Sequence, residues 1–389
     1  RDWSSDVCSS DLECMNKRHI KFNAPYLSKF SKKYIFKVLK NNKFADGEFQ
    51  KKCEVFIERK IKSKCVKLTQ SCTSALETSM ILCNIKKGDE VIIPSFTFTS
   101  TANCLLLRGA KPIFVDINAK DLNIDVAEVE KKINNKTKAI IVVHYAGVAC
   151  DMDKFLRLKK KYNLFLIEDA AHAFLGKYKD KYLGTIGDFG AFSFHETKNI
   201  VGGQGGAISI NNKRFIKPTN IILDKGTDRS ILVTKKYYSW KGLGSEIRAT
   251  ELTSALIYSQ LKISQKIQKK RKDIWDFYYN QISNIEKKDF YILEKNNKIK
   301  QSAYHVFPIV FKNHFIKTKF INYMKSNNID CYFHYYPLHM STFGKKFTKK
   351  KLKITEKVYN GLVRLPLYPG LSKQNQQKII RKTLSFLNN

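Results

Sequence analysis

Acidic residues are scarce in this chain of 389 residues: 34 Asp and Glu stand against 71 Lys and Arg, which gives a formal net charge of +37. Such an excess of positive charge is typical of nucleic-acid-binding proteins. The lysines, however, are scattered along the whole chain among Asn and Ile, and no helix-turn-helix, RNP-like or zinc-finger spacing accompanies them. We therefore expect no nucleic-acid partner. A basic surface would instead attract a small anionic substrate such as a nucleotide diphosphate.

Long apolar runs and metal-type cysteine pairs are missing as well. No stretch approaches the roughly 20 apolar residues that a membrane helix needs, and the N-terminus lacks the apolar core of a secretory signal. The nine cysteines form no CxxC pair, and Cys72, Cys83 and Cys104 lie inside apolar runs. We expect reduced cysteines, no metal site, no membrane contact and a cytoplasmic location.

The first residues differ in character from the rest of the chain. The run RDWSSDVCSSDL resembles the translation of a sequencing-adapter read, and Met15, followed by NKRHIKFNAP, has the features of a native start. We expect residues 1–14 to be non-native and leave them out of the fold prediction.

Short β-branched runs alternate with helix-length segments between residues 64 and 210. The pattern predicts strands at 66–68, 90–94, 111–116, 138–144 and 164–169, and helices at 74–85 and 151–162. This alternation is typical of an α/β fold in which a mostly parallel sheet is covered on both faces. In such sheets ligands bind at the carboxyl ends of the strands.

The pattern changes beyond residue 250. A long helical stretch is predicted from near Ile247 into the 270s, followed by a strand at 304–311 and a helix from about 372 to the end. We expect a large domain at 15–250 and a smaller α+β domain at 251–389. No Pro/Gly-rich linker marks the boundary between them.

Two charged residues follow predicted buried strands. Asp169 ends the strand LFLIED, where a carboxylate is costly to desolvate unless it has a charged partner such as the protonated ring nitrogen of a cofactor. Taken alone, an Asp that caps the next helix is the simpler interpretation. Lys198 lies in a polar turn between the apolar strand GAFSF and the glycine-rich GGQGG. Partial desolvation there would lower its pKa and make the amine a nucleophile toward an aldehyde.

Two further segments, and a serine on the strand before Lys198, carry candidate cofactor contacts. Ser74 and Glu77 in QSCTSALE have the spacing of a capping box. A helix N-terminus there, with the hydroxyls of Thr73 and Ser74, would bind a phosphate, although a plain helix start is as good an interpretation. Ser193, on the strand before Lys198, is placed to donate to a phosphate. Phe98 in PSFTFTSTAN could stack on a cofactor ring, although such an aromatic more often belongs to the core.

Taken together and in this order, the segments resemble the sugar aminotransferases of the DegT/DnrJ/EryC1/StrS family. The resemblance runs from about Phe22 to the C-terminus and is carried by FNAP, PSFTFTSTANCLLLRGAKPIFVD, HYAGVACDMD, IEDAAHA, GTIGDFGAFSFHETKN, KGTDRS and FHYYPLH. It implies a fold-type I aminotransferase, pyridoxal 5′-phosphate (PLP) as cofactor and a homodimer. It also implies the transfer of an amino group from L-glutamate to a nucleotide sugar.

The same resemblance assigns roles to individual residues. Lys198 matches the lysine that forms the Schiff base with PLP, and Asp169 matches the partner of the ring nitrogen. The remaining matches are phosphate contacts at Thr73, Ser74 and Ser193, a stacking aromatic at Phe98, a residue beside the cofactor at His172, and substrate contacts at Arg229, His305 and His339.

One departure and two rival functions complete the prediction. Many relatives place an Asn from the neighbouring subunit near the phosphate, in a motif like GYNYRM, whereas this chain has GSEIRA with Glu246, whose carboxylate would repel a phosphate. PLP-dependent sugar dehydratases on the same fold have histidine in place of the lysine. Lys198 argues against that activity, although His195 lies three residues earlier. Intact Lys198 and Asp169 also argue against a catalytically silent regulatory relative.

Overall fold

The computed structural model describes residues 19–231, 237–285, 289–294, 297 and 299–388. The segment that we expect to be non-native, residues 1–14, lies outside the described residues. Within the described ranges, no helix combines the length and the apolar character needed to cross a membrane.

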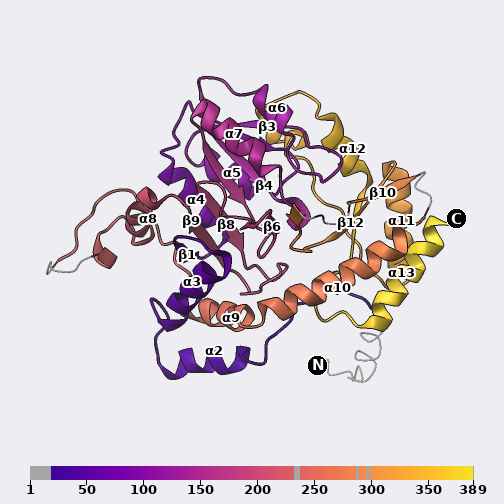
Figure 1. Ribbon diagram of the computed structural model, residues 1–389, viewed down its shortest axis with the longest axis horizontal. Helices are drawn as coiled ribbons and strands as arrows, with labels where there is room; N and C mark the ends of the chain where they lie inside the picture. Colours follow the sequence, from indigo (N-terminus) through magenta and orange to yellow (C-terminus); the bar gives the residue numbers. More distant parts are fainter. Residues whose placement is uncertain (1–18, 232–236, 286–288, 295–296, 298, 389) are drawn as a thin grey trace, which may run out of the picture.

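Seven strands form the central sheet, in the order β1-β9-β8-β5-β4-β2-β3 (Figure 1). Their bounds are Val66–Thr69 (β1), Glu90–Pro94 (β2), Lys111–Val115 (β3), Thr137–Val143 (β4), Phe165–Asp169 (β5), Phe189–Ser193 (β8) and Gly206–Ile210 (β9). Strands β8, β5, β4, β2 and β3 run parallel to their neighbours in that order, whereas β9 is antiparallel to both β8 and β1. The predicted α/β fold with a mostly parallel sheet is confirmed.

Both faces of this sheet are buried, which explains why its strands are apolar at successive positions. On β4, Ile140 and Val142 join one core, while Ala139 and Ile141 join the other. The first face is covered by α3 (Glu48–Ile61), α6 (Val126–Glu130), α7 (Met152–Tyr162) and α9 (Glu251–Leu261), and the second by α4 (Cys72–Leu82), α5 (Ser100–Leu106) and α8 (Ile216–Leu223). Helix α2 (Ser31–Lys40) lies outside α3 and α9.

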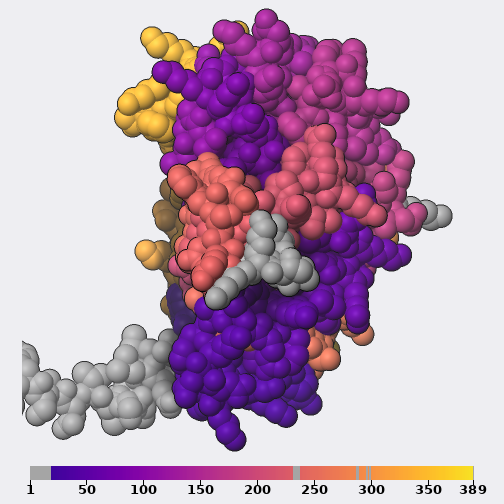
Figure 2. Space-filling model, turned by 90° about the vertical axis from the view of Figure 1, so that its left-hand side faces the viewer, coloured from indigo at the N-terminus to yellow at the C-terminus, as the bar shows by residue number. Residues whose placement is uncertain are grey.

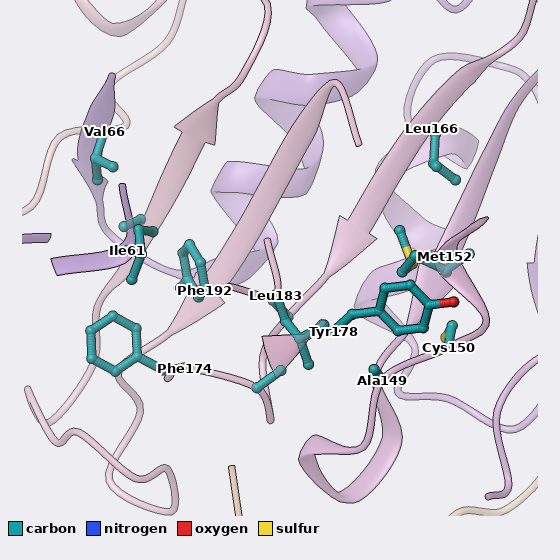
Figure 3. Packing of buried hydrophobic residues seen from close by; sticks show 14 of the residues in the cluster. Ile61, Val66, Ala149, Cys150, Met152, Leu166, Phe174, Tyr178, Leu183 and Phe192 are labelled. Carbon is teal, nitrogen blue, oxygen red and sulfur yellow. The ribbon is translucent and has the colours of Figure 1, made fainter. Parts of the chain in front are cut away.

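The first core also fixes the chain that follows Asp169. Phe174 packs edge-on against Phe192 of β8, with ring centroids 5.7 Å apart, and Leu183 lies in the same cluster (Figure 3). Tyr178, on the short strand β6 (Lys177–Tyr178), is also buried there and its hydroxyl donates to Asp151 over 3.2 Å. Because these side chains are locked in the core, residues 170–174 have a defined position beside the end of β5.

The helix boundaries differ from prediction in places that local chemistry explains. Helix α4 begins at Cys72, two residues before Ser74, because the Ser71 side chain caps it by accepting from the Ser74 N–H over 3.0 Å. The predicted capping box of Ser74 and Glu77 is therefore wrong. The long helix predicted from Ile247 begins at Glu251, capped by Thr250, and a break at Ile263 divides it into α9 and α10 (Ser264–Ile282).

The C-terminal part is a smaller α+β unit. Strands β10 (Phe290–Ile292), β12 (Phe307–Phe311) and β13 (Leu362–Leu365) form an antiparallel sheet, packed with α10, α11 (His314–Ser326) and α13 (Lys373–Leu387) around a third core. Helix α12 is Lys353–Gly361, and β7 (Lys181–Tyr182) and β11 (Lys300–Gln301) extend β6 into a short separate sheet. Ile20 belongs to the third core and pairs with Ile329. The division into domains 15–250 and 251–389 stays a prediction.

The strand predicted at 304–311 begins only at Phe307. Tyr304 has a positive φ of 51°, which interrupts extended backbone. The carbonyls of Tyr304 and His305 accept hydrogen bonds from the buried guanidinium of Arg271, at 3.0 and 2.5 Å, instead of joining a strand ladder. This contact positions the chain just before β12 next to the end of the central sheet.

Candidate active site

A cavity of about 400 Å³ lies at the carboxyl ends of β4, β5 and β8, where ligands bind in sheets of this type. Its wall includes Ser71, Cys72, Thr73, Thr97, Phe98, Ser100, Asp169, His172, Ser193, His195, Thr197, Lys198, His334 and Tyr335. Of the residues predicted for the cofactor, six line this one space: Lys198, Asp169, Thr73, Ser193, Phe98 and His172.

Asp169 is a buried carboxylate at the last position of β5, with 6% of its surface exposed. Burial raises the pKa of its carboxyl, and the hydrogen bonds from Thr101 (2.8 Å) and from the Ala171 N–H (3.2 Å) offset this in part. No described Lys, Arg or His forms an ion pair with it within 4 Å. A cationic group that binds in the cavity would therefore offset the free-energy cost of desolvating this carboxylate.

Lys198 sits in the turn that connects β8 to β9. The turn is closed by backbone hydrogen bonds from Phe194 to Gly205 (2.8 Å) and from Gly202 back to Phe194 (2.7 Å). Burial lowers the pKa of the Lys198 amine to about 8, and the nearby Asp169 carboxylate raises it only partly back toward the ordinary value. The neutral amine, which can attack an aldehyde, is therefore far more populated near physiological pH than in an ordinary lysine, although the charged form still predominates there.

A hydroxyl-lined pocket surrounds the N-terminus of α4. Thr73 lines the cavity and its hydroxyl lies 2.7 Å from that of Ser100, while Ser193 lines it from β8. Ser74 does not line the cavity, because its side chain bonds to the Ser71 hydroxyl over 2.9 Å. Strand β9 passes so close that a Cβ on Gly206 would lie 2.3 Å from the Ser71 carbonyl carbon. The amides of α4 and these hydroxyls fit an anionic group such as a phosphate.

Aromatic rings form another wall of the cavity. Phe98 is 60% exposed and therefore available to a ligand rather than part of the core. Its ring lies 6.5 Å from that of Tyr335, whose hydroxyl is 3.1 Å from Nε2 of His172. Burial, and then the positive charges of Lys198 and Arg364, hold the pKa of His172 well below its usual value. His172 is therefore neutral, and its Nδ1 is buried without a hydrogen-bond partner among the described residues.

A second cavity, of about 280 Å³, adjoins the first and shares Lys198, His172, Thr197 and His334 with it. His305 lines this second space, with its ring 4.2 Å from the ring of His172 and its Nδ1 2.9 Å from the side-chain oxygen of Asn199. The predicted substrate residue His305 is thus brought next to the predicted cofactor residue His172. Two arginines, Arg271 and Arg364, also line this cavity.

Two other predicted substrate residues lie outside both cavities. Arg229 is exposed in the short helix η3 (Arg229–Ile231). This helix belongs to the segment that extends from α8 at the left of Figure 1, the side of the molecule that Figure 2 shows face-on. His339 is buried in η4 (Leu338–Met340), where Nδ1 lies 2.7 Å from the Ser95 hydroxyl and Nε2 lies 3.2 Å from Glu356. Its bonds join the end of β2 to the C-terminal part of the chain.

Glu246 also lies outside both cavities. It forms an exposed ion pair with Lys225 and a backbone bridge with Asp224. The lysine neutralises the carboxylate that we expected to repel a phosphate.

Several residues of the cavities were missed from the sequence. Arg271, His334, Tyr335 and Arg364 all come from the C-terminal part of the chain. Thr101, in the first turn of α5, was missed too; it lines neither cavity but donates a hydrogen bond to Asp169. Only the run FHYYPLH, already noted for His339, signalled His334 and Tyr335. Arg364 is the single charge in the apolar run GLVRLPL, and a charge in such a run could have drawn attention to it.

The residues of the first cavity fit PLP. Asp169 offers a buried carboxylate with no ion-pair partner within 4 Å among the described residues, which suits a protonated ring nitrogen. Lys198 offers an amine of lowered pKa, which suits an aldehyde, and the N-terminus of α4 with Thr73 and Ser193 suits a phosphate. Phe98 is exposed to the cavity and suits a flat ring.

Comparisons with known proteins agree with this chemistry. Residues 25–384 match the DegT/DnrJ/EryC1/StrS aminotransferase family. The chain is 32% identical over 303 residues to GDP-perosamine synthase of Escherichia coli O157:H7, covering 78% of this chain and 80% of that protein. It is 31% identical over 300 residues to dTDP-3-amino-3,6-dideoxy-alpha-D-galactopyranose transaminase of Aneurinibacillus thermoaerophilus, covering 76% and 78%.

A solved structure shares the whole fold. The aminotransferase PseC of Helicobacter pylori, described as involved in the biosynthesis of pseudoaminic acid, superposes with a TM-score of 0.88 at 28% identity, covering 95% of this chain and 99% of that one. The family match spans nearly all described residues, and Lys198 and Asp169 line one cavity that fits the cofactor. The chain therefore belongs to the PLP-dependent DegT/DnrJ/EryC1/StrS aminotransferase family.

Proposed function

We propose that this enzyme transfers the amino group of L-glutamate to the C4 ketone of dTDP-4-dehydro-6-deoxyglucose, giving dTDP-4-amino-4,6-dideoxygalactose. One observation carries the aminotransferase chemistry: Lys198, with its pKa lowered to about 8, and Asp169, with its pKa raised, line the same buried cavity. Such oppositely perturbed groups in one cleft are typical of active sites.

The choice of sugar nucleotide rests on sequence resemblance. The segments HYAGVACDMD and HETKN resemble dTDP-4-amino-4,6-dideoxygalactose transaminases most closely. Relatives of similar identity carry different nucleotides in their names, GDP in one and dTDP in another, so another keto sugar nucleotide is the first alternative. A PLP-dependent sugar dehydratase and a regulatory relative are further alternatives, and the presence of Lys198 in the cavity favours the transaminase over both.

Each residue has a physical role in this proposal. When bound, PLP supplies an aldehyde for the Lys198 amine and a ring that takes up electrons when the substrate loses a proton. The Asp169 carboxylate keeps the ring nitrogen protonated, and Thr101 holds that carboxylate in place. Lys198, once its amine is released, moves the proton as general base and acid. His172 stays neutral and donates or accepts a hydrogen bond beside the ring.

The assembly and location belong to the same proposal. We infer a homodimer in the cytoplasm. Arg229 remains a candidate contact for the anionic substrate, although it lies outside both cavities of its own chain. The net charge of +37 would draw the anionic nucleotide sugar toward the protein. Its product would enter the synthesis of a surface polysaccharide such as lipopolysaccharide.

The visible absorption spectrum tests the proposal. The purified protein is mixed with PLP, then with L-glutamate, and then with a series of 4-keto sugar nucleotides. We expect a yellow band that bleaches with glutamate and returns with a ketosugar, fastest with dTDP-4-dehydro-6-deoxyglucose. A band that ignores every amino donor would favour the dehydratase or regulatory alternative.

A pair of variants assigns the band to one lysine. Lys198→Ala removes the cavity amine, so the band and turnover should both be lost. Lys136→Ala removes an exposed lysine elsewhere and should change neither. Turnover that survives in Lys198→Ala would sink the assignment.

A further inference from the structure

The second cavity has a different character from the first. Its wall lies between the catalytic turn and the C-terminal part of the chain, and it includes Lys198, His305, Arg271 from α10 and Arg364 from β13. Arg271 is 2% exposed. The Nε atom of Arg364 is buried without a hydrogen-bond partner among the described residues.

Neither arginine is neutralised by a carboxylate within the described part of the chain. Arg271 uses Nε and Nη2 to bind the carbonyls of Tyr304 and His305. Arg364 donates from Nη2 to the Phe333 carbonyl over 3.0 Å and stacks over the Phe22 ring at 4.6 Å. Burial of a guanidinium without a counter-ion is costly, and burial lowers the pKa of Arg271 to about 9 for this reason.

The rest of the wall adds no negative charge. The described lining residues include no Asp or Glu. Burial and the neighbouring cations hold the pKa values of His172, His305 and His334 well below their usual range, so the imidazoles stay neutral. The cavity is therefore a small space with excess positive charge and an unused N–H donor, which favours an anion.

We propose that Arg364, supported by Arg271, binds a carboxylate of the amino-acid donor in this second cavity. A guanidinium matches a carboxylate with two parallel hydrogen bonds, and Nε of Arg364 is one such donor. The two cavities meet at Lys198 and His172, so one amino acid can place its amino group beside Lys198 and its carboxylate beside Arg364. The inference rests on the proposed transamination.

The size of the space argues against the other anion that the reaction involves. At about 280 Å³ the second cavity suits a compact dicarboxylic amino acid, whereas a nucleotide sugar is much larger. We therefore expect the diphosphate of the nucleotide sugar to bind outside the second cavity. The experiment below distinguishes binding of the amino-acid carboxylate from binding of the diphosphate.

The test compares the wild type with Arg364→Gln, Arg364→Lys and the control Arg381→Gln, whose arginine is exposed on α13. Glutarate, a dicarboxylate without an amino group, is titrated into each PLP-loaded protein by calorimetry, which reads binding and not turnover. We expect Arg364→Gln to weaken glutarate binding by about tenfold or more. Arg364→Lys should be intermediate, because it keeps the charge and loses the paired geometry, and Arg381→Gln should match the wild type.

The two half-reactions then separate the possible failures. Bleaching of the PLP band is followed against L-glutamate concentration, and its return is followed against ketosugar concentration. A weaker response to glutamate with an unchanged response to the ketosugar supports the subsite. An unchanged glutarate affinity, or a loss confined to the ketosugar step, overturns it while leaving the proposed function intact. A wild-type band that glutamate never bleaches rejects the proposed function itself.

Discussion

His144 lies 3.0 Å from Glu168, joining Nε2 to Oε2, and neither side chain is exposed to solvent. The Cys150 N–H donates to Nδ1 of this histidine, so Nε2 carries the proton and donates to the carboxylate. Glu168 also accepts from the N–H groups of Gly184, Ile186 and Gly187, at 2.8, 2.6 and 2.6 Å. This network anchors β5 one residue before Asp169.

Glu168→Gln should therefore destabilise the fold. The neutral amide offers one acceptor oxygen instead of two, so charge-assisted bonds are lost and buried donors go unsatisfied. We expect a loss of about 2–4 kcal/mol in the free energy of unfolding. Urea denaturation measures it, with Glu128→Gln as control, because Glu128 forms only an exposed ion pair with Lys131. A loss under about 0.5 kcal/mol would show that the network does not hold β5.

The amine of Lys198 should titrate near pH 8. Its pKa is lowered, so the neutral, nucleophilic form dominates above pH 8 and the charged form below it. We expect the rate at which PLP combines with the PLP-free protein to rise through pH 8 and to level off above about pH 9. Stopped-flow absorbance at a series of pH values measures it. A rate still rising near pH 10 would indicate a lysine with an ordinary pKa.

The pH dependence of the free energy of unfolding provides an independent measure of the lowered pKa of Lys198. The folded pKa of Lys198 lies below the unfolded value of about 10.4. The unfolded chain thus binds more protons between pH 8 and pH 10.4, and the cost of burying the charged amine disappears as the pH rises through this window. The wild type should gain stability there relative to Lys198→Met, which has no titrating group.

Asp169→Asn should weaken cofactor binding and also change the lysine. The amide cannot pair with a protonated ring nitrogen, so we expect the affinity for PLP to fall by about tenfold or more. The Asp169 carboxylate also raises the pKa of Lys198, and its loss should move the midpoint of PLP addition further below pH 8. Spectroscopic titration checks both, with Asp180→Asn, an exposed substitution, as control. A midpoint that moves upward would contradict the coupling.

His339→Leu should affect stability rather than substrate recognition. The residue lines neither cavity, but it bonds to Ser95 and Glu356 across the junction with the C-terminal part of the chain. We expect a loss of about 1–3 kcal/mol in the free energy of unfolding and Michaelis constants within about twofold of the wild type. His314→Leu, exposed on α11, is the matched control and should leave stability unchanged. If the variant raised the Michaelis constant for the sugar nucleotide about tenfold, His339 would instead be a substrate contact.

The strands of the central sheet could be predicted because each is recognisable from its own sequence. Parallel strands buried on both faces are apolar at successive positions, so AIIVV of β4 and FLI of β5 are recognisable without knowledge of their neighbours. Asp169 at the end of β5 and Lys198 in the turn after β8 drew attention as charges beside buried strands, but their roles were assigned only from the family resemblance of several segments together. The start of α4 could not, since Ser71 and Ser74 are equally good caps in sequence and only the hydrogen bond from the Ser74 N–H to the Ser71 side chain shows which one is used.

The second cavity could not be predicted from any single segment. Arg271 and Arg364 are more than 70 residues from Lys198 along the chain, and they reach it only because α10 and β13 fold back against the end of the central sheet. Both belong to the 71 basic residues of the chain, and only Arg364, the single charge in the apolar run GLVRLPL, carries a local signal in the sequence. What distinguishes them is burial without a carboxylate, a property of the folded state alone.

The bonds that cross between the two parts of the chain also limit how the enzyme can move. Ser95 holds His339 next to the end of β2, and Asp116, just beyond β3, accepts from the amide and the hydroxyl of Thr355 over 2.7 Å each. A hinge opening would exchange these bonds for bonds to water, which costs free energy. We therefore expect donor and acceptor to diffuse past the exposed Phe98 that lines the first cavity, and product escape, rather than domain closure, to limit the turnover rate.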